Sequence, residues 1–390
     1  MVQNDKFTFI ESALTERVQS QRLRSLQPLQ PIDAVHVARS GQVLLNFSSN
    51  DYLGLSKHPT LIAAAQQYTE QYGTGATASR LVSGTYEIHQ NLEEKLALAC
   101  GREAALLFNS GFQANSTILA VLLDRQSLVL CDRYVHNSLL QGILASGARF
   151  KRYAHNDLHQ LAAALQQAQQ NYSRILIVTE TVFSMDGDCS DLDGLIDLAE
   201  RYGAILYLDD AHAVGVLGQA GMGLAAHRAG VDLVIGTFGK AFGAFGAFVT
   251  CSKKLRDYLI NCCPGFIYTT ALPPAVIGAI EAALLLMPTL ESERQFLRQQ
   301  SNRLRTELQA LGYDTGTSSS QIIPVLLGTE EKTLSLSRWL DEQGILATAI
   351  RPPTVAAGTA RIRLALSSCH TPEHLDSLVA AICIWDNINH

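Results

Sequence analysis

Residues 204–212, AILYLDDAH, join a short apolar run to two aspartates and a histidine. The run is continuous rather than alternating, which predicts a strand buried on both faces of a sheet. Further runs follow at similar intervals, and helical periods over 158–170 and 192–202 lie between several of them. Strands that alternate with helices predict an α/β fold, with a mainly parallel central sheet and helices on both faces. The other predicted strands are 104–108, 127–131, 174–180, 232–236 and 246–250.

The chain divides into three predicted parts, which are an N-terminal helical arm over 1–45, a large domain over 46–285 and a small C-terminal α+β domain over 286–390. Helical apolar spacing from 7 to 26 predicts an amphipathic arm that packs on the body or on a partner. Beyond Ala275 the predicted helices are 274–286, 290–311 and 372–385, and the predicted strands are 322–327, 345–350 and 362–366.

The composition excludes several classes of protein. Of 390 residues, 47% are hydrophobic and 17% charged, which excludes a largely disordered chain. A net charge of −6 offers no basic excess for nucleic acid or an anionic membrane surface. The eight cysteines show neither C-x-x-C nor zinc-ligand spacing, so we expect free thiols in the reducing cytoplasm. We expect neither a signal peptide nor a membrane helix, because no apolar run approaches about 18 residues.

Lys240 lies in the segment 236–243, GTFGKAFG, directly after a predicted strand. Ligands of parallel sheets bind beyond the carboxyl ends of the strands, so this position is suited to a binding site. Small and apolar neighbours desolvate the amine, which disfavours its charged form and leaves a nucleophile. The alternative is a lysine that extends from a strand end into solvent. A phosphate-binding loop is excluded, because Ala241 and Val234 occupy positions where it needs Ser or Thr and Gly.

Asp209 ends an apolar strand, where an unpaired carboxylate would be costly. A cationic partner such as a protonated pyridine nitrogen would compensate that cost, and His212 could hydrogen-bond the same ring. The alternative is a helix cap by Asp209 or Asp210 with a structural histidine. A metal site is less favoured, since no matching third ligand is evident.

Two further segments fit a phosphorylated, aromatic ligand. Residues 110–115, SGFQAN, follow a strand and open a predicted helix, whose N-terminal amides can bind phosphate, and Gly111 permits close approach. His136 follows another strand and could stack on an aromatic ring. An ordinary tight turn and a surface histidine are the alternatives. No G-x-G-x-x-G follows an early strand, which disfavours an NAD-dependent enzyme.

In combination, these segments resemble the pyridoxal-phosphate-dependent α-oxoamine synthases of fold type I. The resemblance rests on 209–212 (DDAH), 237–240 (TFGK), Glu180 and 182–187 (VFSMDG). It implies an enzyme, a C-acyltransferase that condenses an amino acid with an acyl thioester and releases carbon dioxide. It covers nearly the whole chain, including 46–55 (NFSSNDYLGL), 80–84 (RLVSG), 111–112 (GF), 268–270 (YTT) and the C-terminal stretch.

The resemblance implies a role for each residue around pyridoxal 5'-phosphate. Lys240 holds the cofactor covalently and Asp209 pairs with the pyridinium nitrogen. His212 and Ser184 position the phenolate side of the ring, and His136 stacks on it. The catalytic residues that the resemblance implies are Lys240, Asp209, His212 and His136. Gly111, Phe112 and Thr237 hold the phosphate, and Thr269 and Thr270 reach the phosphate of a neighbouring subunit in a homodimer.

Residues 349–363, AIRPPTVAAGTARIR, are most similar to the family members that join L-alanine to a pimeloyl thioester in biotin biosynthesis. The thiol carrier is either coenzyme A or acyl carrier protein. Arg363 then clamps the alanine carboxylate, since its planar guanidinium suits a bidentate contact. The resemblance places Asn50 near that carboxylate, and Arg24, Arg351 and Thr354 against the acyl chain or its carrier.

Two other functions stay open from the sequence: a synthase that uses glycine and another acyl-CoA, and a non-catalytic, cofactor-binding regulator. No basic DNA-binding extension favours the regulator. Three positions depart from the family pattern, and none of them removes a catalytic group. Gly239 stands where serine is frequent, 213–214 (AV) replace Gly-Thr, and 76–78 (ATA) replace a glycine-richer stretch. We expect the last two to reshape the acyl site.

Overall fold

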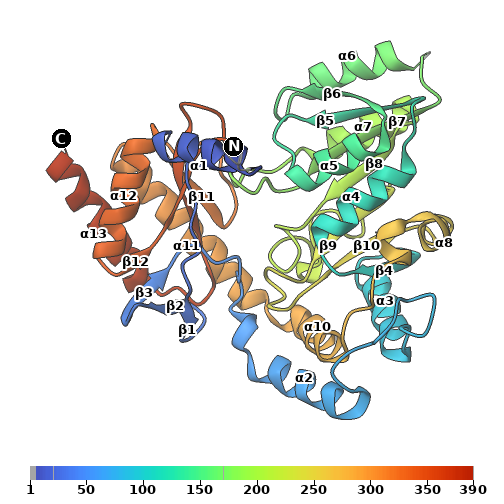
Figure 1. The fold of residues 1–390 in the computed structure, drawn as a ribbon, viewed down its shortest axis with the longest axis horizontal. Coiled ribbons are helices and arrows are strands. Elements are labelled where there is room, and N and C mark those ends of the chain that lie inside the picture. Colours follow the sequence, from blue (N-terminus) through green and yellow to red (C-terminus); the bar gives the residue numbers. More distant parts are fainter. Residues whose placement is uncertain (1–5, 21, 170, 390) are drawn as a thin grey trace, which may run out of the picture.

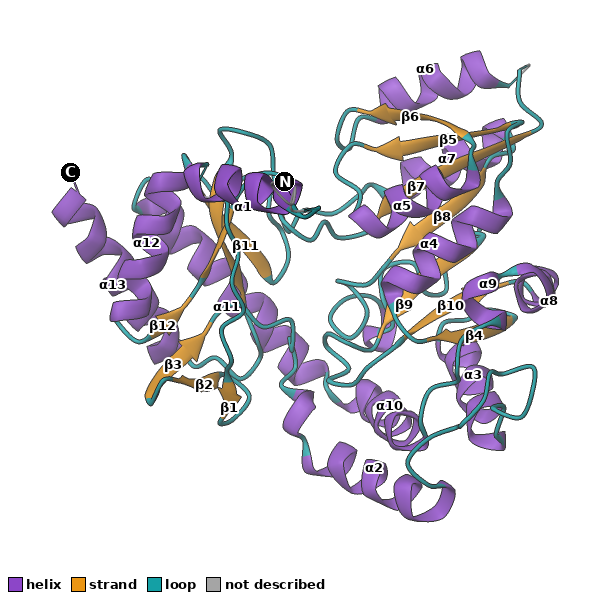
Figure 2. Cartoon of the chain, in the orientation of Figure 1, coloured by secondary structure: helices purple, strands orange, loops and turns teal. Residues whose placement is uncertain are grey.

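The computed structural model describes residues 6–20, 22–169 and 171–389, and residues 1–5 and 21 of the predicted arm lie outside the described residues. The chain forms two lobes that face each other (Figure 1). The larger lobe contains a seven-stranded sheet and the smaller lobe holds two shorter sheets (Figure 2). This is the predicted α/β architecture.

The seven strands lie in the order β4-β10-β9-β8-β7-β5-β6. Strand β10 runs antiparallel to both of its neighbours, and all other pairs are parallel. The predicted mainly parallel sheet is therefore confirmed. Its strands are β4 (Ala104–Phe108), β5 (Ser127–Asp132), β6 (Arg149–Tyr153), β7 (Arg174–Glu180), β8 (Ile205–Asp209), β9 (Leu233–Thr237) and β10 (Ala247–Cys251).

Both faces of this sheet are covered. In β8, Leu206 and Leu208 belong to one apolar cluster, whereas Tyr207 belongs to another, and all three side chains are fully buried. This explains the continuous apolar pattern of the strand. The helices of the large lobe are α2 (Pro59–Tyr72), α3 (Glu87–Ala99), α4 (Gly111–Leu122), α5 (Asn137–Ser146), α6 (Leu158–Ala168), α7 (Leu192–Tyr202), α8 (Lys253–Cys262), α9 (Pro264–Ile267) and α10 (Pro274–Leu286).

The smaller lobe combines C-terminal and N-terminal segments. Strand β3 pairs in parallel with β12, so the strands of the predicted arm join the C-terminal lobe. A second sheet has the antiparallel order β11-β14-β13. The elements are β1 (Gln30–Pro31), β2 (His36–Arg39), β3 (Gln42–Asn46), α11 (Glu291–Ala310), β11 (Ile322–Gly328), α12 (Glu330–Glu342), β12 (Ile345–Leu346), β13 (Thr348–Ile350), β14 (Ala360–Ala365) and α13 (Pro372–Asn389).

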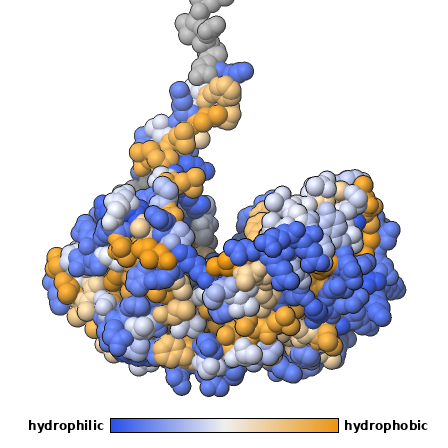
Figure 3. Space-filling model, turned by 90° about the horizontal axis from the view of Figure 1, so that it is seen from below, coloured by the Kyte–Doolittle hydropathy of each residue, from blue (hydrophilic) through white to orange (hydrophobic). Residues whose placement is uncertain are grey.

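The N-terminal helix differs from the prediction. Helix α1 spans Thr8–Gln19 rather than 7–26, and none of its residues is buried. It stands away from the body with apolar side chains exposed (Figure 3). The helix itself therefore does not pack on the body, whereas Arg22 and Arg24, which follow it in the predicted arm, contact Glu330 and Thr354 of the small lobe. Packing of the helix on a partner stays a prediction.

Among the described residues, no single helix has the length and the apolar composition to cross a membrane. One pair of helices, Pro274–Thr289 and Glu291–Ala310, meets both criteria together, but it is bent by 76° at its break.

Candidate active site

A pocket of about 370 Å³ lies at the carboxyl ends of β7, β8 and β9. Its lining comes from both lobes, since Arg363 belongs to β14 and Asp209 to β8. The fold thus brings together most of the site residues predicted from the sequence. Those that line this pocket are Asn50, Gly111, Phe112, His136, Ser184, Asp209, His212, Thr237, Lys240 and Arg363.

Lys240 follows β9 by three residues, and its amine enters the pocket. Burial lowers the pKa of Lys240 to about 8, although the nearby carboxylates Asp209 and Glu180 oppose this effect. Nζ makes no hydrogen bond or ion pair with the residues that the structure describes. A neutral, nucleophilic fraction of the amine is therefore present near neutral pH and available to a ligand.

Asp209 is held by neighbours on two sides. Asn115 Nδ2 donates to Oδ2 at 2.7 Å, and the backbone N–H of Ala211 donates to Oδ1 at 3.0 Å. Asn115 is oriented in turn by the hydroxyl of Tyr207, which donates to its Oδ1 at 2.9 Å. The carboxylate is only 7% exposed and makes no ion pair with a described side chain. Its geometry is fixed, and a cation in the pocket would offset its burial.

His136 is part of the same network. Its Nδ1 lies 2.8 Å from Ser138 Oγ, and Ser138 accepts a hydrogen bond from Asn115 at 3.0 Å. Burial lowers the pKa of His136, and this effect outweighs the opposing charge of Asp209, while the positive charge of Lys240 adds to it. Its backbone N–H donates to Glu180 Oε1 at 2.6 Å. The imidazole is therefore neutral and fixed in orientation, as a residue that stacks on a ring requires.

His212 lies beside Tyr52, whose hydroxyl is 2.7 Å from its Nδ1. Burial lowers the pKa of His212 well below its ordinary value, and Lys240 and Arg363 add to the effect. The ring is therefore neutral and can serve as a hydrogen-bond partner rather than a charge. Tyr52 also donates to Asn50 Oδ1 at 3.0 Å, which connects the ring side of the pocket to its substrate side.

The N-terminus of α4 forms the phosphate end of the pocket. Ser110 caps the helix by accepting from the N–H of Gln113 at 3.1 Å, which leaves the N–H groups of Gly111 and Phe112 without helical partners. A side chain at Gly111 would meet no atom within 4 Å, so space is open above the amides. Thr237 lies opposite, and its Oγ1 accepts from the N–H of Gly239 at 3.2 Å.

Thr269 and Thr270 do not line this pocket. Thr269 Oγ1 accepts from Gln113 at 2.6 Å, and the carbonyl oxygen of Thr270 accepts from Asn109 at 3.0 Å. Both lie behind the start of α4 in their own chain. A contact with the phosphate of a neighbouring subunit therefore stays a prediction.

Arg363 is the cation on the small-lobe side. Its Nε donates to the carbonyl oxygen of Ser184 at 2.5 Å, and Nη2 donates to Asn50 Oδ1 at 3.1 Å. The side chain is nearly buried. Such a fixed guanidinium fits a carboxylate.

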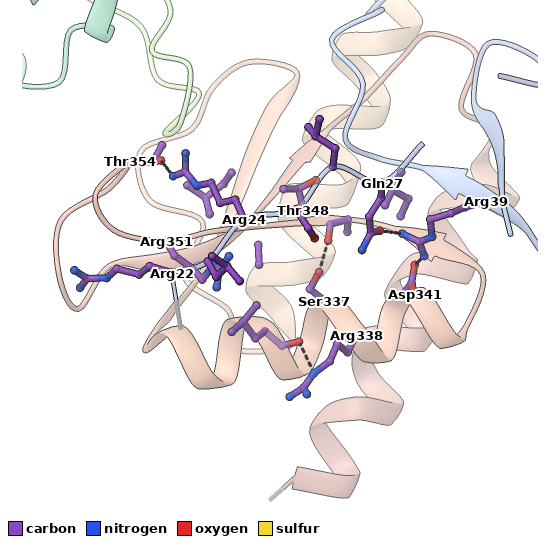
Figure 4. Close-up of a pocket in the computed structure, with 18 of the residues that line it drawn as sticks. Arg22, Arg24, Gln27, Arg39, Ser337, Arg338, Asp341, Thr348, Arg351 and Thr354 are labelled. Carbon is purple, nitrogen blue, oxygen red and sulfur yellow. Dashed lines mark hydrogen bonds and ion pairs between the residues drawn. The ribbon is translucent and has the colours of Figure 1, made fainter. Parts of the chain in front are cut away.

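A second pocket, of about 1020 Å³, holds the other predicted substrate residues (Figure 4). Arg24 Nη2 donates to Thr354 Oγ1 at 3.0 Å, which ties the N-terminal segment to the loop after β13. Thr348 and Ile350 line both pockets, so the two share a wall. Arg22 forms an ion pair with Glu330, and Arg39 forms one with Asp341. The arginines that line this pocket are Arg22, Arg24, Arg39, Arg338 and Arg351.

The departures from the family pattern lie outside both pockets. Ala213 and Val214 are buried in the core, and Ala76 is buried as well. The expectation that they reshape the acyl site finds no support in the lining. At Gly239, an added Cβ would meet only Thr237 Oγ1, at 3.7 Å, so this position has room for the more frequent serine.

The residues present fit pyridoxal phosphate. One pocket is surrounded by the Lys240 amine, by the buried Asp209 carboxylate and by open helix amides, and neither of the two side chains makes an ion pair with a described residue. These groups match, in turn, the aldehyde, the pyridinium nitrogen and the phosphate of the cofactor.

Comparisons with known proteins agree with this reading. Residues 42–382 match the family described as Aminotransferase class I and II. An 8-amino-7-oxononanoate synthase of Gluconacetobacter diazotrophicus is 51% identical over 381 residues, which is 96% of each chain. A solved serine palmitoyltransferase variant from S. paucimobilis, with a bound aldimine of pyridoxal phosphate and myriocin, superimposes with a TM-score of 0.91 at 26% identity, over 98% of each chain. A solved 8-amino-7-oxononanoate synthase from Francisella tularensis gives 0.75 at 28% identity, over 89% of this chain and 98% of its own.

The fold and the lysine-centred pocket define a pyridoxal-phosphate-dependent α-oxoamine synthase of fold type I. Its cofactor is pyridoxal 5'-phosphate. Within that class, the chain belongs to the 8-amino-7-oxononanoate synthase family. It is a C-acyltransferase with 8-amino-7-oxononanoate synthase activity, which serves biotin biosynthesis.

Proposed function

We propose that the chain joins L-alanine to a pimeloyl thioester and releases carbon dioxide and the free thiol. One observation carries this proposal: Lys240 and Arg363 line one pocket, and that pocket shares a wall with the arginine-lined pocket. The first pocket suits a small amino acid with a carboxylate. The second suits a longer, anionic acyl donor.

Pyridoxal phosphate, when bound, supplies an electron sink through its protonated ring. The chain's own residues prepare the reaction around it. Asp209 would hold the ring nitrogen through its negative charge, and His136 would stack on the ring. Lys240 Nζ removes the Cα proton of alanine, which its pKa of about 8 permits near neutral pH.

Arg363 holds the carboxylate of alanine through N–H groups of Nη1 and Nη2, because its Nε already donates to Ser184. The contacts to Ser184 and Asn50 fix the position of the guanidinium. When the carboxylate of alanine is held by Arg363, the orientation of the amino acid is fixed and its Cα proton can face Lys240. This is a positioning effect, in which correct orientation lowers the barrier.

The arginine-lined pocket takes the acyl donor in this proposal. The shared wall of Thr348 and Ile350 lets an acyl chain extend from the alanine site towards Arg24 and Arg351. Guanidinium groups suit the phosphates of coenzyme A and the acidic surface of a carrier protein equally. The proposed acyl site is therefore compatible with coenzyme A and with acyl carrier protein as the thiol carrier.

We also propose a homodimer in the cytoplasm. Exposed apolar side chains surround the predicted shared threonines, because Ser79 pairs with Thr270 and brings the next residues alongside. A second copy of the chain would cover them. All eight cysteines are free, which suits a reducing compartment. The exposed side chains are Leu81, Val82, Phe112, Phe245 and Tyr268.

A variant pair separates the two substrate sites. Arg363→Ala should weaken alanine binding roughly ten- to a hundredfold, because a charged hydrogen-bonded contact contributes about 1.5–3 kcal/mol. Arg351→Ala should leave alanine binding unchanged and raise the KM for pimeloyl-CoA. Cofactor absorbance during an alanine titration without thioester measures the first effect, and thiol release measures the second. Loss of alanine binding in Arg351→Ala alone would show that the two roles are reversed.

Mixed dimers test the shared site. Lys240→Ala and the double variant Thr269→Ala/Thr270→Ala should each be inactive. After subunit exchange, mixed dimers should regain part of the activity, because one of their two sites then carries intact residues from both chains. Thiol release before and after exchange measures the recovery. Its absence after verified exchange would place each site within a single chain.

The choice of amino acid tests the proposal as a whole. Holoenzyme that receives pimeloyl-CoA with alanine, glycine or serine should release thiol fastest with alanine. A higher kcat/KM with glycine would favour the glycine-using alternative instead.

A further inference from the structure

His155 lies outside both pockets and bridges two carboxylates. Its Nδ1 is 3.0 Å from Asp132 Oδ1, and its Nε2 is 2.7 Å from Asp188 Oδ2. A carboxylate accepts hydrogen bonds, so both ring nitrogens carry a proton and the imidazole is a cation. Burial opposes that charge, but the two carboxylates raise the pKa of His155 to about 10.

The surroundings of His155 fix it closely. The centroid of the His155 ring lies 4.6 Å from that of Tyr134 and 4.4 Å from that of Phe183, and the Phe183 contact is edge to face. The next residue, Asn156, has a φ of 54°, a left-handed conformation that costs energy in a non-glycine residue. From this position Asn156 Nδ2 also donates to Asp188 Oδ2, at 3.0 Å. Two adjacent side chains thus converge on one carboxylate.

Asp188 is the last residue of a loop, 182–188, that belongs to the large lobe and contacts the small lobe. In this loop, the carbonyl oxygen of Gly187 accepts hydrogen bonds from the N–H groups of Ser319 and Ser320, at 3.0 and 3.1 Å. A Cβ at Gly187 would lie 1.9 Å from the carbonyl oxygen of Ile322, so the small lobe packs directly against this loop.

The same loop also orients the arginines of the small lobe. Ser184 holds Arg363 by its carbonyl oxygen, and Asp186 pairs with Arg361. The position of Arg363 in the alanine site therefore depends on where the loop lies.

The other carboxylate, Asp132, precedes the loop that leads to His136. Asp132 ends β5 and is fully buried. It also accepts from the backbone N–H groups of Tyr134 and Asn156, both at 2.8 Å, and His136 follows two residues after Tyr134. His155 thus connects the loop before the ring-stacking histidine to the loop that orients Arg363.

We propose that the His155 cation is a positioning residue for alanine binding, because it fixes the loop 182–188 and through it Arg363. The proposal rests on the proposed role of Arg363 as the carboxylate site. His155 touches neither the cofactor pocket nor the substrate. A merely structural role would lower stability and leave the alanine affinity of folded, cofactor-loaded protein unchanged.

The variant His155→Gln removes the charge and keeps a polar side chain. Its alanine dissociation constant should rise about tenfold or more, the loss expected for a charged hydrogen bond. Cofactor content and the KM for pimeloyl-CoA should stay at the wild-type values. His159→Gln is the matched control, because His159 is exposed on the neighbouring helix α6 and should change nothing.

The variant Asp188→Asn tests the other end of the bridge and serves as the second route if His155→Gln does not fold. It should also weaken alanine binding. In the double variant, the loss should be smaller than the product of the two single effects, since both remove the same interaction. Multiplied effects, or wild-type alanine affinity in either folded single variant, would overturn the proposal.

Hydrogen exchange separates this proposal from the function on which it rests. In holoenzyme without substrates, amides of 182–188 should exchange faster in His155→Gln than in wild type or His159→Gln. If wild-type protein did not bind alanine, the proposed function would fail, while faster exchange would still support the link from His155 to the loop. Unchanged exchange in the loop would refute that link, whatever the substrate.

Discussion

Replacing Lys240 by alanine should reduce turnover by at least about 10⁴-fold. The change removes a nucleophile and a general base, and general acid–base catalysis alone contributes on the order of 10²–10⁴-fold. The pocket itself should survive, because Lys240 makes no hydrogen bond to a described residue. Thiol release measures the loss, and Lys254→Ala, on the exposed surface of α8, is the control.

The covalent role of Lys240 has a direct chemical readout. Borohydride reduction of the holoenzyme followed by peptide mass mapping should place the reduced cofactor on Lys240 only. An adduct on another lysine, or none in cofactor-saturated protein, would contradict the assignment.

Asp209→Asn should keep the cofactor and lose most of the turnover. The amide preserves the shape of the side chain and one acceptor for Asn115, but it cannot stabilise a positive charge on the ring nitrogen. We expect a loss on the order of 10²- to 10³-fold, as for removal of one preorganised electrostatic contact. Steady-state thiol release and cofactor absorbance measure the two effects separately.

The control for Asp209→Asn is Asp197→Asn, an exposed position on α7. Near wild-type turnover in a cofactor-loaded Asp209→Asn protein would contradict the role of the carboxylate. Loss of the cofactor from the variant would show instead that the main role of Asp209 is to bind the cofactor.

The central sheet could be predicted from the sequence because its strands are buried on both faces. Burial leaves a continuous apolar signal, as in Ile205–Asp209 and Leu233–Thr237. Strand β6 was missed for the opposite reason. It lies at the edge of the sheet, and four of its five residues, RFKRY, are exposed, so the apolar pattern is lost. The helix of the predicted arm is shorter than its apolar spacing indicates, and none of the residues Thr8–Gln19 is buried in the described chain.

The site could be predicted in part for a topological reason. Parallel strands end at one edge, so Asp209, Lys240 and Glu180 meet although they lie far apart in the sequence. The residues that orient them could not be found in this way. Asn115 is placed by a helix and Tyr52 by a loop, and neither carries a charge that a sequence pattern would reveal.

His155 and the shared threonines show two further limits. The sequence does not indicate a role for His155, because its partners Asp132 and Asp188 are brought to it only by the fold. Thr269 and Thr270 lie behind their own helix, so their predicted contact depends on a second copy of the chain.

The fate of the alanine carboxyl carbon tests the proposed condensation most directly. Purified holoenzyme is given pimeloyl-CoA and L-alanine labelled at the carboxyl carbon, and the product and released gas are analysed by mass spectrometry. We predict unlabelled 8-amino-7-oxononanoate, with the label recovered in carbon dioxide and one thiol released per product. A product that keeps the label, or no product from alanine while glycine reacts, would contradict the proposed reaction.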